Sequence, residues 1–169
     1  MSRRWQCGTC GEWHGDLPLC FGWDAPAQWS ILSDAERRNS ELADSACVIE
    51  TANETSFYVR GHIEIPIRDY AEPFIWSVWA SLSEMSFEHA MEHWNTEGRE
   101  ADEPYFGWLC SSLPVYPDTM FLKTGVQSMP VGLVPLITLE PTDHPLAVDQ
   151  RSGVDIEQVQ SWAERLLHD

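Results

Sequence analysis

The stretch TSFYVRGHIEIPI, residues 55–67, decides the fold class of this chain. Its apolar side chains all share one parity: Phe57, Val59, Ile63, Ile65 and Ile67. The other parity carries polar or amphipathic side chains: Tyr58, Arg60, His62 and Glu64. Strict alternation predicts a strand with one buried and one polar face. Gly61 predicts a kink or bulge, and Pro66 indicates that the strand ends or lies at an edge.

Further strand and helix patterns surround this strand. Four segments read as strands: residues 46–50, 73–83, 119–127 and 134–140. A capping box from Ser33 to Glu36 predicts a helix over residues 34–43. Ser86 is the expected N-cap of a second helix, and an apolar stripe from Ile156 to Leu167 predicts a third. Strands and helices do not alternate as a parallel sheet requires. We therefore expect an α+β fold, with a mainly antiparallel sheet and helices packed on one face.

Length and composition set the class of protein. The chain has 169 residues, 43% of them hydrophobic, with nine tryptophans, which suits a single domain over residues 1–169 with a substantial core. Aromatic residues at strand and helix periods are expected in that core: Trp76, Trp79, Trp94, Trp108, Tyr105 and Phe106. No apolar run suggests a signal peptide or a membrane span, and five cysteines without a disulfide framework favour the cytoplasm.

Charge narrows the range of partners. Acidic residues number 27 against 10 basic ones, for a formal net charge of −17. Such a surface repels nucleic acid backbones and anionic membranes. The chain also lacks a glycine-rich phosphate loop and a dinucleotide-binding fingerprint. A basic protein is therefore the expected partner.

The stretch CGTCGEWH, residues 7–14, predicts a metal site. Cys7 and Cys10 form a Cys-x-x-Cys-Gly motif, and His14 follows within reach of the same ion. Thiolates and imidazoles are the preferred ligands of structural zinc. A redox dithiol is the rival reading, but such motifs lie between a strand and a helix, and neither is expected here. Residues 5–23 are therefore expected to form a metal-ordered loop that resembles a zinc knuckle.

The fourth zinc ligand has three candidates. Cys20 would give a run with nearly the spacing of retroviral-type knuckles, although the basic residues with which those bind nucleic acid are absent. His62 stands on the polar face of the strand at residues 55–67, and His144 lies in the stretch TDHPLA. A single histidine is more often a surface residue than a ligand, so residue types alone leave the choice open.

The order of motifs along the chain resembles the bacterial domain of unknown function 2199 family. The likeness rests on these stretches: CGTCGEWH, LPLCFGWDAP, CVIE, FYVRGHIEIPI, WSVWASLSE, YFGWL, YPDTMFLKT and DHPLAVDQRSGV. The resemblance implies one intracellular domain with an N-terminal Cys-x-x-Cys-Gly-x-x-His element, here Cys7, Cys10, Gly11 and His14. It also implies that another residue usually replaces Cys20 and that a cysteine can replace His62. On that ground we expect His62 to be the fourth ligand.

Two other groups of polar residues have ordinary explanations. His89 and His93 are four positions apart on an expected helix, but they lie opposite its apolar stripe and are expected on a solvated face. Arg60 and Glu64 share a strand face, where a cross-strand ion pair is expected. Neither group predicts an active site.

The sequence thus favours a small acidic binding module with a structural zinc site, one that could cap a basic protein as an immunity protein does. The alternative is a zinc hydrolase with an open coordination position and a carboxylate such as Glu64 as general base. A thiol oxidoreductase is the third reading. Whether the protein is an enzyme is not decided by these patterns, which lean toward a binding role.

Overall fold

The structure is a computed structural model that describes residues 4–168, and it is an α+β fold. Its elements follow in this order: β1 (Arg4–Gln6), β2 (Trp13–Asp16), β3 (Cys20–Gly22), the 3-10 helix η1 (Ala27–Ile31), α1 (Asp34–Arg38), β4 (Glu41–Leu42), β5 (Ala46–Glu50), β6 (Thr55–Ile65), β7 (Phe74–Leu82), α2 (Glu84–Glu92), the 3-10 helix η2 (Arg99–Ala101), β8 (Tyr105–Leu109), β9 (Lys123–Gln127), β10 (Leu136–Leu139), α3 (Pro145–Ser152) and α4 (Ile156–His168).

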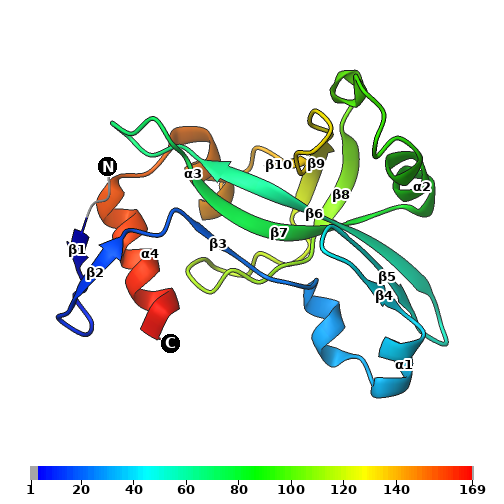
Figure 1. Cartoon of the computed structure of the whole chain (residues 1–169), viewed down its shortest axis with the longest axis horizontal. Helices are drawn as coiled ribbons and strands as arrows, with labels where there is room; N and C mark the ends of the chain where they lie inside the picture. The colour runs from blue at the N-terminus through cyan, green and yellow to red at the C-terminus, as the bar shows by residue number, and fades with distance from the viewer. Residues whose placement is uncertain (1–3, 169) are drawn as a thin grey trace.

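Strands β6 to β10 close into a five-stranded barrel (Figure 1). Each strand pairs antiparallel with the next one in the chain, and β10 returns to β6 in parallel orientation. Strands β5 and β4 extend β6, and β3 pairs in parallel with β7. The expectation of a mainly antiparallel sheet is therefore only partly met, because the sheet closes on itself and two of its pairs are parallel.

Closure of the barrel depends on Gly61. A Cβ atom at this position would lie 2.8 Å from the carbonyl oxygen of Pro135, and the N–H of His62 donates to that same oxygen at 2.9 Å. The β6–β7 register runs without a shift from Phe57, opposite Leu82, to Ile65. The predicted bulge is therefore absent from this pair, and the glycine instead lets β10 approach β6 closely.

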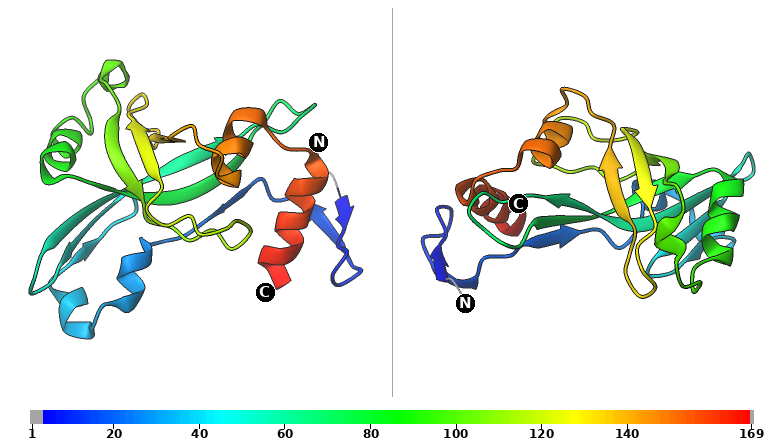
Figure 2. Two further views of the ribbon diagram at one scale, coloured as in Figure 1. Left: turned by 180° about the vertical axis from the view of Figure 1, so that it is seen from behind. Right: turned by 90° about the horizontal axis from the view of Figure 1, so that it is seen from above.

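The helices surround the barrel instead of covering one face as predicted. Helix α1 contacts β5, α2 contacts β6, and α3 contacts β6 and β10. Helix α4 lies beside β1 and β2 at one end of the molecule, away from α1 and α2 (Figures 1 and 2). The capping box of Ser33 and Glu36 is present. The N-cap of α2 is Ser83 and not Ser86, because the Ser83 hydroxyl accepts from the Ser86 N–H.

Two buried clusters lie on the two faces of the β6–β7 pair. The larger contains Ile63, Phe74 and Trp76, and the smaller surrounds Trp79 and Tyr58. Trp76 and Trp79 are fully buried, as predicted. The prediction was wrong for two aromatics on β8, since Phe106 is 54% exposed and Trp108 is 40% exposed. Both side chains lie on the outer face of the barrel. Alternation within a strand separates its two faces but does not tell which of them is buried.

Candidate metal centre

The Cys-x-x-Cys-Gly motif forms the turn of a β-hairpin. Trp5 of β1 pairs with His14 of β2, so residues 5–23 form a hairpin followed by β3 and not the loop that was expected. Inside the turn, the N–H of Gly11 donates to the carbonyl of Cys7 at 2.9 Å. Gly11 has a φ of 75°, a conformation that favours glycine. The hairpin thereby presents Cys7, Cys10 and His14 on one side.

The last turn of α4 supplies a fourth donor. The Cys7 Sγ lies 3.1 Å from Nε2 of His168, and the Cys10 Sγ lies 3.3 Å from Nε2 of His14. The ligand atoms of all four residues lie within 4.8 Å of one another. Cys7 and His168 are 161 positions apart in the chain. The structure thus assembles a Cys2His2 set from two distant segments, and we refer to these four residues as the Cys/His cluster.

One polar stripe of α4 holds the hairpin in place. Gln160, Glu164 and His168 follow each other at intervals of four, so they share one helix face. Nε2 of Gln160 donates to the carbonyl of Gln6 at 3.1 Å, and the N–H of Gly8 donates to Oε1 of Glu164 at 2.7 Å. The Gly8 N–H, followed by the side chain of Gln160, lowers the pKa of Glu164. The carboxylate is therefore held in its charged form.

Apolar contacts complete this docking. Trp5 and Cys7 pack with Ala163 of α4, and Leu17 packs against the same small cluster. The Trp5 ring also stacks on the imidazole of His14 with centroids 4.9 Å apart, which orients that side chain. The hairpin is thus positioned by both polar and apolar contacts with α4.

The cluster is buried on one side and open on the other. Cys7 is 1% exposed, whereas Cys10 and His168 are exposed and His14 is half-buried. Burial opposes ionisation of the Cys7 thiol, but hydrogen bonds from the backbone of Cys10 and Thr9 outweigh it, and the pKa is lowered. Backbone N–H groups directed at a thiolate also stabilise it as a metal ligand.

The three residues expected as possible fourth ligands, His62, Cys20 and His144, do not belong to the cluster. The expectation for His62 is therefore not met by the structure. His62 is held on β6 between β7 and β10, where burial lowers its pKa. Cys20 lies on β3, where it pairs with Ile75 of β7, and burial raises the pKa of the Cys20 thiol. His144 caps α3 through the Leu146 N–H. His168 is the fourth member of the cluster. The sequence offers little sign of it, because the helix at the C-terminus was predicted from its apolar stripe and His168 lies on the polar stripe of that helix.

His89 of α2 and His93, the C-cap of that helix, form no comparable group. Their rings stack with centroids 4.1 Å apart, and Nδ1 of His89 lies 2.6 Å from the hydroxyl of Tyr105. Within residues 4–168, no third histidine, cysteine or carboxylate joins them in a possible metal site. Arg60 likewise contacts Ser77 and Asp24, and no ion pair with Glu64 is formed among the described residues.

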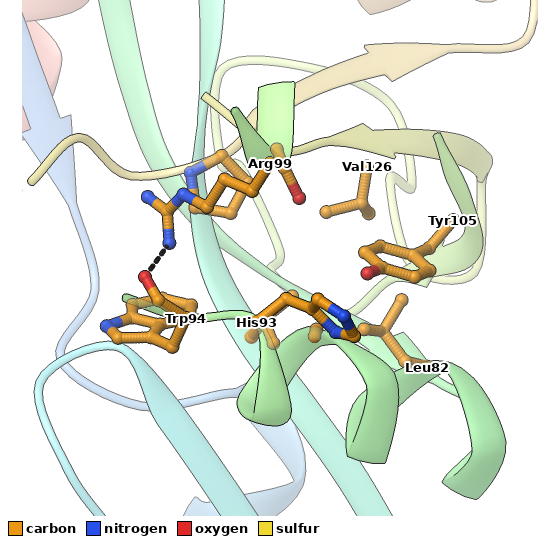
Figure 3. A pocket seen from close by; sticks show the side chains of 10 residues that line it. Leu82, His93, Trp94, Arg99, Tyr105 and Val126 are labelled. Atoms are coloured by element: carbon orange, nitrogen blue, oxygen red, sulfur yellow. Dashed lines mark hydrogen bonds between the residues drawn. The ribbon is translucent and has the colours of Figure 1, made fainter. Parts of the chain in front are cut away.

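A small enclosed cavity lies under α2 (Figure 3). It has a volume of about 10 Å³, room for about one water molecule. Arg99 lies at its wall and is 6% exposed. Its guanidinium donates to the carbonyls of Trp94, Met129, Pro130 and Leu133. The guanidinium thus joins the residue that follows the C-cap of α2, Trp94, to the segment before β10.

The fold and site together define the class: a barrel-containing α+β protein with a Cys2His2 cluster that could hold a metal ion. The chain belongs to the DUF2199 family, described as an uncharacterized protein conserved in bacteria, whose model matches residues 6–154. That match includes Cys7, Cys10 and His14, and it ends before α4. No curated protein and no solved structure matches the chain. Between residues 4 and 168, no helix combines the length and apolar character needed to cross a bilayer.

Proposed function

We propose that this protein is a binding module in which one Zn²⁺ ion, held by the Cys/His cluster, fastens the β1–β2 hairpin to α4. The observation that carries the proposal is the convergence of four donor atoms, from the two ends of the described chain, within 4.8 Å. Tetrahedral zinc with bonds of 2.0 to 2.3 Å separates its ligands by roughly 3.3 to 3.8 Å. The four side chains thus need only small rotations to bind one ion.

Zinc is favoured by the chemistry of the donors. Two thiolates and two imidazoles suit Zn²⁺, whereas Mg²⁺ and Ca²⁺ require oxygen ligands. The polar stripe of α4 supports the same role, since Glu164 fixes the turn that carries both cysteines. Metal binding would therefore add to a contact that the protein chain already makes.

A structural role for the ion is favoured over a catalytic one. Catalytic zinc keeps a position open for water, whereas four protein ligands occupy the tetrahedral set. Glu64, the expected general base of a zinc hydrolase, is exposed on β6 and does not belong to the cluster. For a thiol oxidoreductase, Cys7 and Cys10 would need the N-terminus of a helix, but they lie in a hairpin turn. These two functions have less support.

The partner we propose is a basic protein. The net charge of −17 would steer such a partner and disfavour nucleic acid and anionic membranes. We also propose that the protein caps its basic partner, as an immunity protein does, and that it resides in the cytoplasm. Binding that persists at high salt would argue for a different, apolar interface.

Elemental analysis of the purified protein tests the metal site. The protein is prepared without a polyhistidine tag, which would itself bind zinc. We expect about one zinc per chain in the wild type and less than a tenth of that in Cys7→Ser, Cys10→Ser, His14→Ala and His168→Ala. Cys20→Ser, His62→Ala and His144→Ala are matched controls and should keep their zinc. A zinc-free wild type, or loss in His62→Ala but not in His168→Ala, would overturn the assignment.

A further inference from the structure

The loop that joins β9 to β10 presents apolar side chains to solvent. Leu133 is 55% exposed and Val131 is 42% exposed. The N–H of Leu133 donates to the carbonyl of Pro130 at 3.0 Å, and Gly132 between them has a φ of 96°. These features define a tight turn with glycine at the position that requires a positive φ. The turn projects from the barrel (Figure 2), so both apolar side chains are available to a partner.

The backbone of this loop is firmly anchored. The guanidinium of Arg99 donates to the carbonyl of Met129 at 2.6 Å and to that of Leu133 at 2.8 Å. Nε2 of Gln127 donates to the carbonyl of Asp102 at 2.9 Å, which ties the end of β9 to the segment before β8. Binding residues concentrate on loops that a rigid scaffold positions, and an ordered loop loses less conformational entropy when a partner binds.

A groove of about 570 Å³ continues this apolar surface along the outer face of the barrel. It reaches the base of the loop at Gln127 and Leu136, which face each other in the β9–β10 pair. Gly125 leaves space beside Phe106, its partner on β8, and a Cβ atom at Gly125 would lie 3.6 Å from that of Pro104. We refer to the groove and the loop together as the β9–β10 face, with these apolar residues: Pro104, Phe106, Gly125, Val131, Leu133 and Leu136.

The edge of this face beside the loop is acidic. Arg99 is the only basic residue in the segment 97–103, and its buried guanidinium is bound to the carbonyls of the loop. At the other end of the groove, Lys123 and Glu140 carry opposite charges. The loop end of the face is therefore bordered by negative charge, which comes from four carboxylates: Glu97, Glu100, Asp102 and Glu103.

We propose that the β9–β10 face is the surface on which the basic partner docks, through a segment in which an apolar anchor is flanked by arginine or lysine. The anchor lies in the groove over Gly125 against Phe106. Further apolar side chains cover Val131 and Leu133, and the basic side chains meet the carboxylates of residues 97–103.

The composition of the face supports this occupant. Grouped exposed apolar side chains mark interaction sites, whereas scattered ones do not, and an apolar centre with a polar rim is the usual anatomy of a protein interface. A second copy of this chain fits less well, since two molecules of net charge −17 repel each other. The inference rests on the proposed function only for the existence of a basic partner, and it does not depend on the metal.

The test is a titration of the full chain with the capped peptide Arg-Leu-Arg-Leu-Arg, followed by the backbone amide signals in NMR spectra. The capped peptide Arg-Ser-Arg-Ser-Arg has the same charge and no apolar anchor. We expect the leucine peptide to shift the signals of Gly125, Val131 and Leu133 and the serine peptide to bind at least fivefold more weakly. Equal binding of the two peptides, or no shift at these residues, would overturn the proposal.

Variants of the apolar residues locate the anchor. Val131→Ser with Leu133→Ser should weaken binding of the leucine peptide about tenfold. The matched control is Ile31→Ser with Met85→Ser, since both side chains are 82% exposed and lie off this face, and its binding should stay within twofold of wild type. Gly125→Val, which places two methyl groups in the groove, should weaken the leucine peptide about fivefold and leave the serine peptide unchanged. Full binding in both altered proteins would contradict the assignment.

Variants of the carboxylates separate the acidic edge from the total charge. Glu97→Gln with Glu103→Gln should weaken binding of both peptides at least fivefold. Glu72→Gln with Glu157→Gln also removes two exposed carboxylates, before β7 and on α4, and should stay within twofold of wild type. Equal losses in the two double variants would mean that total charge alone matters, and the proposal would fail.

Three further readouts keep this proposal distinct from the proposed function. Shifts that lie elsewhere for both peptides would leave a basic partner in place and remove this docking face, whereas no binding of either peptide would remove both. Zinc content of the same samples reports on the metal site alone. In analytical ultracentrifugation the free protein should be a monomer; a dimer that Val131→Ser with Leu133→Ser dissociates would show that a second copy covers the face, and the basic partner would be excluded from it.

Discussion

The barrel and the Cys/His cluster are held together by different forces. The barrel strands β8, β9 and β10 bury Leu109, Val126 and Ile137 almost completely, so burial of apolar surface stabilises the barrel. The β1–β2 hairpin has strands of three and four residues, and a two-stranded hairpin of this kind is marginal in water. It depends on α4 and, in our proposal, on zinc. One end of the molecule should therefore respond to metal while the other does not.

The largest expected effect comes from emptying the barrel core. Leu109→Ala should reduce the free energy of unfolding by about 4 kcal/mol, because a fully buried side chain of β8 is replaced by a cavity. Urea denaturation with and without a chelator measures it, and the loss should be the same in both. Trp108→Ala is the matched control and should cost only about 1 kcal/mol, since Trp108 is 40% exposed. A loss that depends on metal would show that the two regions unfold together.

The next effect concerns the buried guanidinium of Arg99. Arg99→Met should destabilise the protein by about 3 kcal/mol, because it leaves four backbone carbonyls without their donor. Arg38→Met removes an exposed charge from α1 and should change the free energy by less than about 0.5 kcal/mol. Equal changes in the two variants, measured by urea denaturation, would contradict the structural role of Arg99.

Removal of the metal tests the comparison directly. With free zinc a hundred times above its dissociation constant, binding should raise the free energy of local opening by about 2.7 kcal/mol. Hydrogen exchange measured by mass spectrometry should show this protection over residues 4–16 and 156–168 and little change in β6 and β7. His168→Ala should exchange like the metal-free wild type, and His62→Ala should not. An equal loss across β6 and β7 would remove the distinction between the two regions.

The smallest effect is a gain of stability. Phe121→Gly should raise the free energy of unfolding by about 1 kcal/mol, because glycine adopts a φ of 62° without strain and little buried surface is lost. Asp69 has a φ of 65°, but aspartate tolerates that region better, so Asp69→Gly should gain only a few tenths. Thermal unfolding of both variants provides the measurement. A destabilised Phe121→Gly would mean that the ring packs more firmly than its exposure indicates.

Local patterns predicted many of the elements correctly. The alternation of residues 55–67 contains β6, which ends at Ile65, just before Pro66. The capping box at Ser33 begins α1, and the apolar stripe after Asp155 lies on α4. Short elements were missed, among them β8 and α3, because few residues leave little periodicity to read. Helix α1 ends at Arg38 and not near residue 43, since the chain turns there into β4.

The sequence by itself determined three members of the cluster, Cys7, Cys10 and His14, because donors within one short turn must stay close however the rest of the chain folds. It also determined that strand β6 has a buried face. Only the tertiary structure decided that β10 closes the barrel against Gly61 and that His168 joins the cluster. Both contacts link segments far apart in the chain, and such contacts depend on how all the intervening elements pack, which no local pattern of residues records.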